Sequence, residues 1–302
     1  MWFLFALLTT LSWGAADLFY KKGSDSNDKY SHIKIGIMVG IVMGIHGILY
    51  MITNGIAFVP LDIVKYLPVS FFYILSMLIG YLGLRYIELS ISSPVQNSSG
   101  AITAIALLIL FPEQLRVIDI TGILLITGGV VGLAILEKKL QDEALKAENV
   151  AVDPKYQISF LAITFPILYA VLDAAGTAAD GIYLDKLSLI SEDAALLAYE
   201  FTWLIYAIIS WIFLSVIKKQ KFNVLKEPVR LSAAVFETIG QFFYVFAISN
   251  NAVVSAPMIA SYSIVSVILS RIFLKEKLSK QHYILIVIVM IGIIVLGVAE
   301  EL

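Results

Sequence analysis

The chain has 302 residues, of which 60% are hydrophobic and 15% are charged, and its formal net charge is −2 at pH 7. Soluble domains are closer to half apolar and a quarter charged, so this composition indicates a membrane protein. The small negative charge argues against a nucleic-acid partner, and the lack of cysteine excludes disulfides, thiolate metal sites and cysteine nucleophiles. Three scattered histidines, His32, His46 and His282, argue against a histidine metal centre, and we expect no cofactor.

Ten windows of the sequence are long and apolar enough to cross a membrane, since a span needs about 20 mostly apolar residues. In chain order they cover 1–20, 32–53, 66–87, 91–111, 117–136, 157–178, 192–217, 229–249, 251–273 and 281–299. The first window has no basic residues ahead of it, so we expect a retained helix and not a cleaved signal peptide. The polar stretch 138–156 divides the spans five and five, and its first part is expected to form a short surface helix.

The chain also contains an internal repeat. Pro94 aligns with Pro257 and Glu113 with Glu276 without a gap, in a chain that has only eight prolines. A weaker alignment at the start of each half pairs Asp17 of the first span with Asp173 of the sixth. The protein is therefore predicted to be a duplication.

Five spans in each half is an odd number, so the second half enters the membrane in the opposite orientation. We predict an all-α polytopic membrane protein of ten transmembrane helices, in which residues 1–137 form the first five-helix repeat, 138–156 a polar linker and 157–302 the second, inverted repeat. Inverted repeats are typical of secondary transporters. In support, 18 of the 21 Lys and Arg residues fall in or beside loops that follow odd-numbered spans. By the positive-inside rule these loops are cytoplasmic, and both termini lie outside.

Glycines repeat every four residues in the second span, at Gly36, Gly40 and Gly44. Such a stripe leaves one helical face without Cβ atoms and allows another helix to approach closely. We expect this contact to be made within the chain and not with a second copy.

Carboxyl groups inside the spans mark the candidate site. A charged side chain at the centre of a membrane helix costs about 2.5–3.5 kcal/mol on insertion scales, so such residues usually face a cavity or a partner. Four acids lie well inside spans: Asp17, Asp173, Glu200 and Glu237. Basic residues at comparable depth are scarce, so the interior is expected to be net negative or partly protonated.

Aromatic and amide side chains accompany these acids, several of them at the three-, four- and seven-residue spacings that place side chains on one helical face. The candidate substrate-binding residues are Trp13, Asp17, Tyr169, Asp173, Glu200, Trp203, Glu237, Gln241, Tyr244 and Tyr262. Aromatic rings with carboxylates and few opposing cations suit a cationic or amine-bearing ligand. Glu237 and Glu200 are also the candidates for proton coupling.

Two alternatives remain open for the same residues. The acids can serve only to carry protons, with a neutral or anionic metabolite as the cargo. Asp17 and Asp173 can instead be structural and hydrogen-bond to neighbouring helices, while the aromatic residues form the belt at the membrane interface. For His46 we expect a packed neutral ring and not a proton relay.

The turns that end the fourth and ninth spans, at 111–115 (FPEQL) and 274–279 (LKEKLS), carry a family resemblance. They resemble the Glu-x-Leu-Ser turn of the drug/metabolite transporter superfamily, in its ten-span EamA-domain branch. The small-residue closing helices of both halves and the Ser12-Trp13-Gly14 triplet are similar to the family as well.

The resemblance covers the whole chain. It implies secondary transport or exchange of small metabolites through a central cavity between two five-helix halves, and it names no substrate. The chain departs from the family in two respects. Members usually have both termini in the cytoplasm, and they often have a small residue before the glutamate, where this chain has Phe111 and Pro112.

Other protein classes are less well supported. The chain contains neither the GxxxxGK[ST] loop of a primary pump nor the HExxH motif of a zinc protease. A channel would share the acidic interior and would differ by a conductance that does not saturate with substrate. We therefore predict a transporter and not an enzyme, with no catalytic residues. Its partners would be a small organic cation, amine or amino acid and the lipid bilayer of a bacterial-type plasma membrane, and its state a monomer or homodimer.

Overall fold

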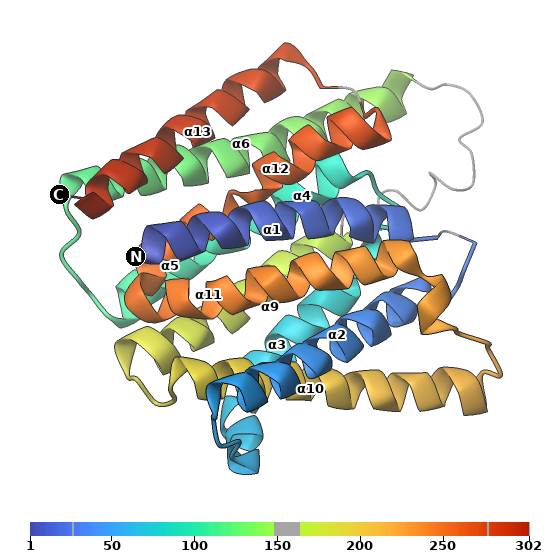
Figure 1. Ribbon diagram of the computed structural model, residues 1–302. Coiled ribbons are helices and arrows are strands. Elements are labelled where there is room, and N and C mark those ends of the chain that lie inside the picture. Colours follow the sequence, from blue (N-terminus) through green and yellow to red (C-terminus); the bar gives the residue numbers. More distant parts are fainter. Residues whose placement is uncertain (26, 148–163, 277, 302) are drawn as a thin grey trace.

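The structure is a computed structural model that describes residues 1–25, 27–147, 164–276 and 278–301, and every regular element in these ranges is helical (Figure 1). Nine helical stretches in this part of the chain are long and apolar enough to cross a membrane. A helix satisfies its backbone hydrogen bonds internally, which the apolar interior of a bilayer requires. The predicted all-α polytopic fold is confirmed.

The first half of the chain forms six helices. They are α1 (Trp2–Gly23), α2 (Ser31–Asn54), α3 (Pro60–Gly83), α4 (Leu89–Asn97), α5 (Ser99–Leu110) and α6 (Val117–Ala147). α4 and α5 follow each other directly and make one stretch long enough to span. Left-handed Gly55 (φ 65°) ends α2, and Pro60 begins α3, so glycine and proline define this turn.

The described part of the second half contains five α-helices, with short π-helical extensions and one 3₁₀ segment. They are α9 (Thr164–Gly181) with η1 (Ile182–Lys186), α10 (Glu192–Ile212) with η2 (Phe213–Ile217), η3 (Val224–Lys226), α11 (Pro228–Ala260), α12 (Tyr262–Leu269) with η4 (Ser270–Leu274), and α13 (Lys280–Glu301). The Ser191 hydroxyl caps α10 by accepting a 3.3 Å hydrogen bond from the Ala194 backbone N–H.

The boundaries differ from the prediction in two places. The predicted eighth and ninth spans form one 47-residue stretch, Pro228–Leu274, which is more than twice the length that one crossing needs. Asn251 interrupts it with non-helical angles (φ −167°, ψ 82°), so the stretch is consistent with two crossings and with ten in all. The predicted surface helix after the fifth span is not separate, because α6 continues to Ala147. The rest of the predicted linker, up to 163, lies outside the described residues.

Helices of the two halves pack against each other in pairs (Figure 1). α1 contacts α11, α2 contacts α10, α3 contacts α9 and α6 contacts α13. The first long helix of each half thus meets the third of the other half. The second helices meet each other, as do the last ones. Exchanging the halves leaves this set of contacts unchanged, as a pseudo-two-fold axis requires.

The glycine stripe of α2 makes the predicted contact within the chain. A Cβ atom on Gly40 would lie 2.2 Å from the backbone oxygen of Trp203 in α10, and one on Gly36 would lie 2.8 Å from the Tyr206 ring. Gly129 of α6 packs in the same way, since its added Cβ would lie 2.2 Å from Val289 of α13. The close contacts of α2 with α10 and of α6 with α13 therefore depend on glycine, which has no side chain to keep the helices apart.

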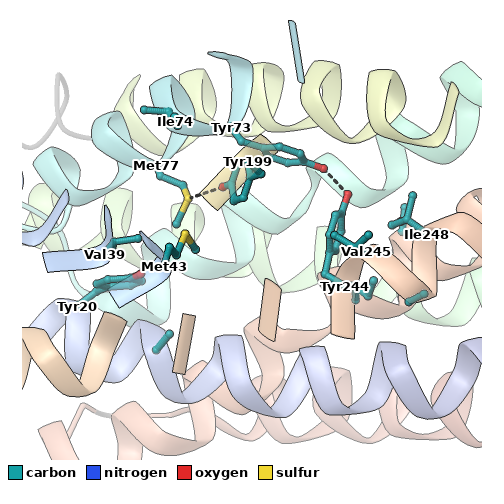
Figure 2. Close-up of a cluster of buried hydrophobic side chains, with 14 of the residues drawn as sticks. Tyr20, Val39, Met43, Tyr73, Ile74, Met77, Tyr199, Tyr244, Val245 and Ile248 are labelled. Atoms are coloured by element: carbon teal, nitrogen blue, oxygen red, sulfur yellow. Dashed lines mark hydrogen bonds between the residues drawn. The ribbon is translucent and has the colours of Figure 1, made fainter. Parts of the chain in front are cut away.

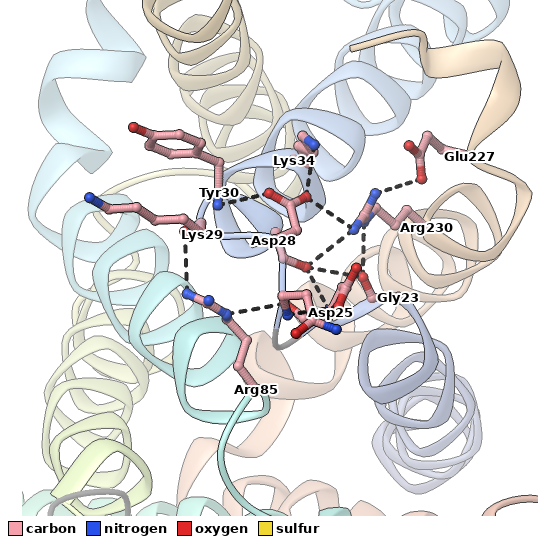
Figure 3. A network of polar contacts seen from close by, with 11 residues as sticks. Gly23, Asp25, Asp28, Lys29, Tyr30, Lys34, Arg85, Glu227 and Arg230 are labelled. Carbon is pink, nitrogen blue, oxygen red and sulfur yellow. Dashed lines mark hydrogen bonds and ion pairs between the residues drawn. The ribbon is translucent and has the colours of Figure 1, made fainter. Parts of the chain in front are cut away.

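The two termini lie at one end of the bundle, and the α1–α2 and α10–α11 loops lie at the other (Figure 1). A polar network joins these two loops (Figure 3). Arg230 donates to the Gly23 backbone oxygen at 3.0 Å and to the Glu227 carboxylate at 2.6 Å, and it lies 3.9 Å from Asp28. Lys34 donates to Asp28 at 2.7 Å. At this end of the bundle the two halves are thus joined by Arg230, through its hydrogen bond to the Gly23 backbone oxygen and its ion pair with Asp28.

Candidate functional site

A narrow cavity lies among helices from both halves of the chain. Seven of the ten predicted substrate-binding residues line it: Trp13, Asp17, Tyr169, Asp173, Glu237, Gln241 and Tyr262. Its free volume is about 40 Å³, which is room for only a few water molecules. An organic molecule would fit only after the lining side chains or the helices that carry them move.

Asp17 of α1 is held by serines from both halves. Its Oδ2 atom accepts hydrogen bonds from Ser93 of α4 at 2.6 Å and from Ser266 of α12 at 2.7 Å. Asp173, its counterpart in the repeat, accepts a 2.7 Å hydrogen bond from Ser99 at the start of α5. In both cases a hydroxyl from the opposite half reaches the carboxyl group.

Glu237 projects from α11 beside aromatic side chains of α1. It accepts a 3.1 Å hydrogen bond from the Tyr20 hydroxyl, and its backbone oxygen accepts one of 3.3 Å from the Trp13 indole. Gly240 makes room for this indole, because an added Cβ would lie 2.3 Å from it. The Trp13 ring stacks on Tyr244 with centroids 5.0 Å apart. These contacts orient the acid and the rings on the α1–α11 interface.

Tyr244 lies in an adjoining smaller cavity, which shares Trp13, Asp173 and Tyr262 with the first. Its hydroxyl hydrogen-bonds to the Tyr73 hydroxyl of α3 (Figure 2). The two cavities together hold eight of the ten predicted residues.

Two predicted residues lie elsewhere, on a face of α10 that packs against α2. The Glu200 side chain is fully buried and its Oε1 atom is 2.7 Å from Nδ1 of His46. Trp203 is also buried, beside Gly40. The side chain of Tyr199, one residue before Glu200, does line the cavity. A step of one residue turns a helix by about 100°, which separates the two side chains.

Several residues that line the cavity are not among the predicted substrate-binding residues. Tyr20, Gln96 and Tyr199 were expected in the polar interior, whereas Tyr73, Met77, Gly80, Tyr81 and Leu84 were missed. Figure 2 shows Tyr73, Met77 and Tyr199 together, with the Tyr199 hydroxyl 3.6 Å from the Met77 sulfur. The signal on α3 is the spacing of its tyrosines along one face, at 66, 73 and 81. That span has no buried acid to draw attention to it.

The charge of the cavity lining is one-sided. Three carboxyl groups face it, and none of the described residues lining it is Lys or Arg. Lys21, in the last turn of α1, is not part of this lining. Its ammonium group donates hydrogen bonds to the backbone oxygens of Leu84 and Ile87 at 2.9 and 2.6 Å. Within the described residues no three His, Asp or Glu side chains come together in a way that could hold a metal ion.

The paired turns of the repeat lie at opposite ends of the cavity helices. The Glu276 carboxylate accepts hydrogen bonds from the backbone N–H groups of Leu89 and Ser90, at 3.3 and 3.0 Å, and so caps α4. Burial, together with the negative charge of Glu276, raises the pKa of neighbouring Glu88. At the other end Lys186 donates to Glu113 at 2.6 Å.

Comparison with known proteins agrees with this geometry. The model of the EamA-like transporter family matches residues 1–135 and 164–298, one copy in each half. A crystal structure of a protein has the same fold, with a TM-score of 0.66 and 15% sequence identity over 98% of this chain and 96% of that one. No curated protein matches the chain. The chain belongs to the EamA-like transporter family, which confirms the resemblance to the drug/metabolite transporter superfamily.

Proposed function

We propose that this membrane transporter is a secondary active exporter or exchanger of a small organic cation, amine or amino acid, located in a bacterial-type plasma membrane. The observation that carries the proposal is the central cavity. Three carboxyl groups, Asp17, Asp173 and Glu237, face it among tyrosines and a tryptophan, with no Lys or Arg in the described lining. An ammonium group would supply the missing positive charge.

The physical preference for a cation has two sources. A carboxylate away from water is costly unless it is paired, and a bound cation would pair it. Aromatic faces attract ammonium groups by about 0.5–2 kcal/mol each, more when the site is dry. Trp13, Tyr169 and Tyr262 line the same space as Asp17 and Asp173. We therefore propose that the acids bind the charged nitrogen and that the rings bind its apolar substituents.

The proposed mechanism is alternating access by two inverted five-helix repeats, residues 1–137 and 157–302. The pairing of α1 with α11 and of α3 with α9 supports this mechanism, because the pairing is the same when the two halves are exchanged. One half can then rock against the other to open the cavity to either side of the membrane. The narrowness of the cavity also supports it, since a steady pore would be open. Asp17 and Asp173, the repeat-related acids, would shape the two halves of the binding site.

For proton coupling we propose Glu237, which is positioned to hold either the ligand or a proton. Glu200 lies outside the cavity against His46, so for this residue we propose a role in proton coupling without contact to substrate. One observation favours the alternative of a neutral or anionic cargo. The carboxyl groups of Asp17 and Asp173 already accept hydrogen bonds from serine hydroxyls. Acids that have such partners do not need a cationic cargo and could serve only to bind protons.

A thermal-shift screen of the purified protein in detergent distinguishes these cargoes. The panel holds choline, ethanolamine, lysine, succinate and glucose, each tested at two pH values. A ligand at 100 times its Kd that binds only the folded state adds about 2.7 kcal/mol of stability. We expect the cations alone to raise the melting temperature. Stabilisation by succinate or glucose alone would overturn the cation assignment.

A further inference from the structure

Asp180 is a buried acid that the proposed transport cycle does not yet use. It lies near the end of α9, two turns beyond Asp173, and its side chain is fully buried. The Tyr66 hydroxyl of α3 donates a hydrogen bond to its Oδ1 atom. Its Oδ2 atom is buried and has no hydrogen-bond partner. Burying a charged carboxylate oxygen without a hydrogen bond costs free energy, and burying the protonated, neutral carboxyl group costs much less.

A chain of hydroxyl groups connects this acid to the cavity. Tyr244 of α11 is a neighbour of the Asp180 carboxyl group, and its hydroxyl hydrogen-bonds to Tyr73 of α3. The Tyr73 hydroxyl in turn lies 2.8 Å from Oγ1 of Thr177. Tyr73 lines the central cavity, and Tyr73, Thr177 and Tyr244 line the adjoining one. Figure 2 shows the Tyr73–Tyr244 contact.

This chain can be hydrogen-bonded in either direction. Each hydroxyl carries one hydrogen and can both donate and accept. In the contact between Tyr73 and Tyr244 either oxygen can be the donor. The hydrogens can therefore all point toward Asp180 or all point toward Thr177, and passing one proton along the chain converts one arrangement into the other.

Among the described residues, the groups that act on Asp180 are hydroxyls and include no cation that would hold it ionised. α3 contributes Tyr66 and Tyr73, and α11 contributes Tyr244. From α5 and α11 the apolar side chains of Leu107 and Ala252 pack against Gly181, the next residue. On its own helix the nearby acid is Asp173, and the cation that follows, Lys186, is paired with Glu113 and Asp185 at 2.6 and 3.1 Å.

We propose that Asp180 is a proton-carrying residue of this transporter, linked to the substrate cavity by the hydroxyls of Tyr244 and Tyr73. The inference rests on the proposed function. A proton arriving from the terminal end of the bundle binds Asp180. When Asp180 releases it, Tyr244 takes that proton and passes its own hydrogen to Tyr73, which passes its hydrogen to the Asp173 carboxylate in the cavity lining. Each hydroxyl loses one proton and gains one, so Asp180 becomes negative as Asp173 becomes neutral.

The first test measures the proton itself and needs no substrate. Infrared spectra of the purified protein are recorded at two pH values, for wild type and for Asp180→Asn. We expect the variant to lack one C=O stretching band of a protonated carboxyl group. Asp193→Asn is the matched control, because Asp193 accepts a 2.7 Å hydrogen bond from Tyr50 outside the hydroxyl chain. Identical spectra for wild type and Asp180→Asn would overturn the proposal.

The second test measures coupling in proteoliposomes with radiolabelled choline. We expect Asp180→Asn to lose at least ten-fold in uptake driven by a pH gradient and to keep choline exchange at equal pH within two-fold. Tyr73→Phe removes one hydroxyl of the chain and leaves the carboxyl group. Because Tyr73 also lines the cavity, we expect exchange to fall as well, but uptake driven by a pH gradient should fall at least ten-fold more than exchange at equal pH. This variant covers the case in which Asp180→Asn does not fold. Gradient-driven uptake at the wild-type rate in both variants would overturn the relay. A wild-type protein that moves choline in neither mode would contradict the proposed function instead, and the infrared result would still decide whether Asp180 holds a proton.

Discussion

The hydroxyl of Ser266 donates a 2.7 Å hydrogen bond to Oδ2 of Asp17, and the two residues are 249 positions apart in the sequence. The bond joins the first helix of one half to the ninth predicted span, in the other half. Ser99 makes the related contact to Asp173 at 2.7 Å. Asp17 and Asp173 therefore each accept a hydrogen bond from the half of the protein to which they do not belong, and relative movement of the halves would change this hydrogen bonding.

Replacing Ser266 by Ala should lower the stability of the protein. A hydrogen bond to a carboxylate contributes about 1.5–3 kcal/mol, but Ser93 still donates to Asp17, so we expect the lower end of this range. The melting temperature in detergent measures the effect. Ser232→Ala is the control, because Ser232 is exposed and bonds only within its own helix. An equal melting temperature for the two variants would argue against the interhelix bond.

Replacing Glu237 by Gln should abolish choline uptake driven by a pH gradient and leave the fold intact, because Gln keeps the size of the side chain and can neither lose a proton nor carry a negative charge. Uptake is measured at several pH values, with the melting temperature as the test of folding. Glu301→Gln, an exposed change at the end of α13, serves as the control. Normal uptake with a normal pH response in Glu237→Gln would contradict the assignment.

Adding a methyl group to Gly40 should destabilise the protein by about 1–3 kcal/mol, as overpacking does. The new Cβ would lie 2.2 Å from a backbone oxygen of α10, which cannot move aside as a side chain can. Gly128→Ala is the matched control on α6, since nothing lies within 4 Å of its added Cβ. We expect Gly128→Ala to be neutral or to stabilise by about 0.4–1 kcal/mol. Thermal melts that rank the two variants in the opposite order would exclude the close α2–α10 contact.

The loop network should give a stability contribution that disappears in acid. Burial alone would raise the pKa of Asp28, but hydrogen bonds from Lys34 and the Tyr30 backbone, with the charges of Lys34 and Arg230, lower this pKa below its usual value of 3.8. A lowered pKa of an acid means that the contribution is complete above 3.8 and is lost as the pH falls through the folded-state value.

The melting temperature of the wild type should therefore exceed that of Asp28→Asn by a constant difference from neutral pH to about pH 5. This difference should shrink as the pH approaches and falls below 3.8. Melting curves of both proteins across this range provide the measurement. A difference that already falls between neutral pH and pH 5 would mean that another group controls this end of the bundle.

The fold was largely predictable because its signals are periodic and repeated. Long apolar windows fixed most spans, and the alignment of Pro94 with Pro257 and of Glu113 with Glu276 predicted two copies, which the family match also has. The break at Asn251 falls at the predicted boundary between the eighth span, 229–249, and the ninth, 251–273. The absence of a loop there could not be predicted, because both flanking segments are apolar and helical and only the backbone angles of one residue separate them.

The candidate site was most predictable where a helix carried an acid together with aromatic or amide residues on one face. Trp13, Asp17, Glu237 and Gln241, which follow this rule, line the cavity. The rule fails to show which face of a helix points inward, and on α10 the cavity side belongs to Tyr199 while Glu200 points toward α2. It also overlooks α3, whose contribution to the cavity is mainly neutral tyrosines.

Cation binding in the cavity is tested most directly by choline exchange at equal pH across the membrane of proteoliposomes that contain the purified protein. We expect saturable accumulation of labelled choline against unlabelled choline inside the vesicles, competed by ethanolamine and not by succinate. We also expect a strong loss of exchange in Asp17→Asn and Asp173→Asn, because both acids face the cavity. Flux no greater than in protein-free vesicles, or flux that rises without saturation, would contradict an acidic carrier site for organic cations.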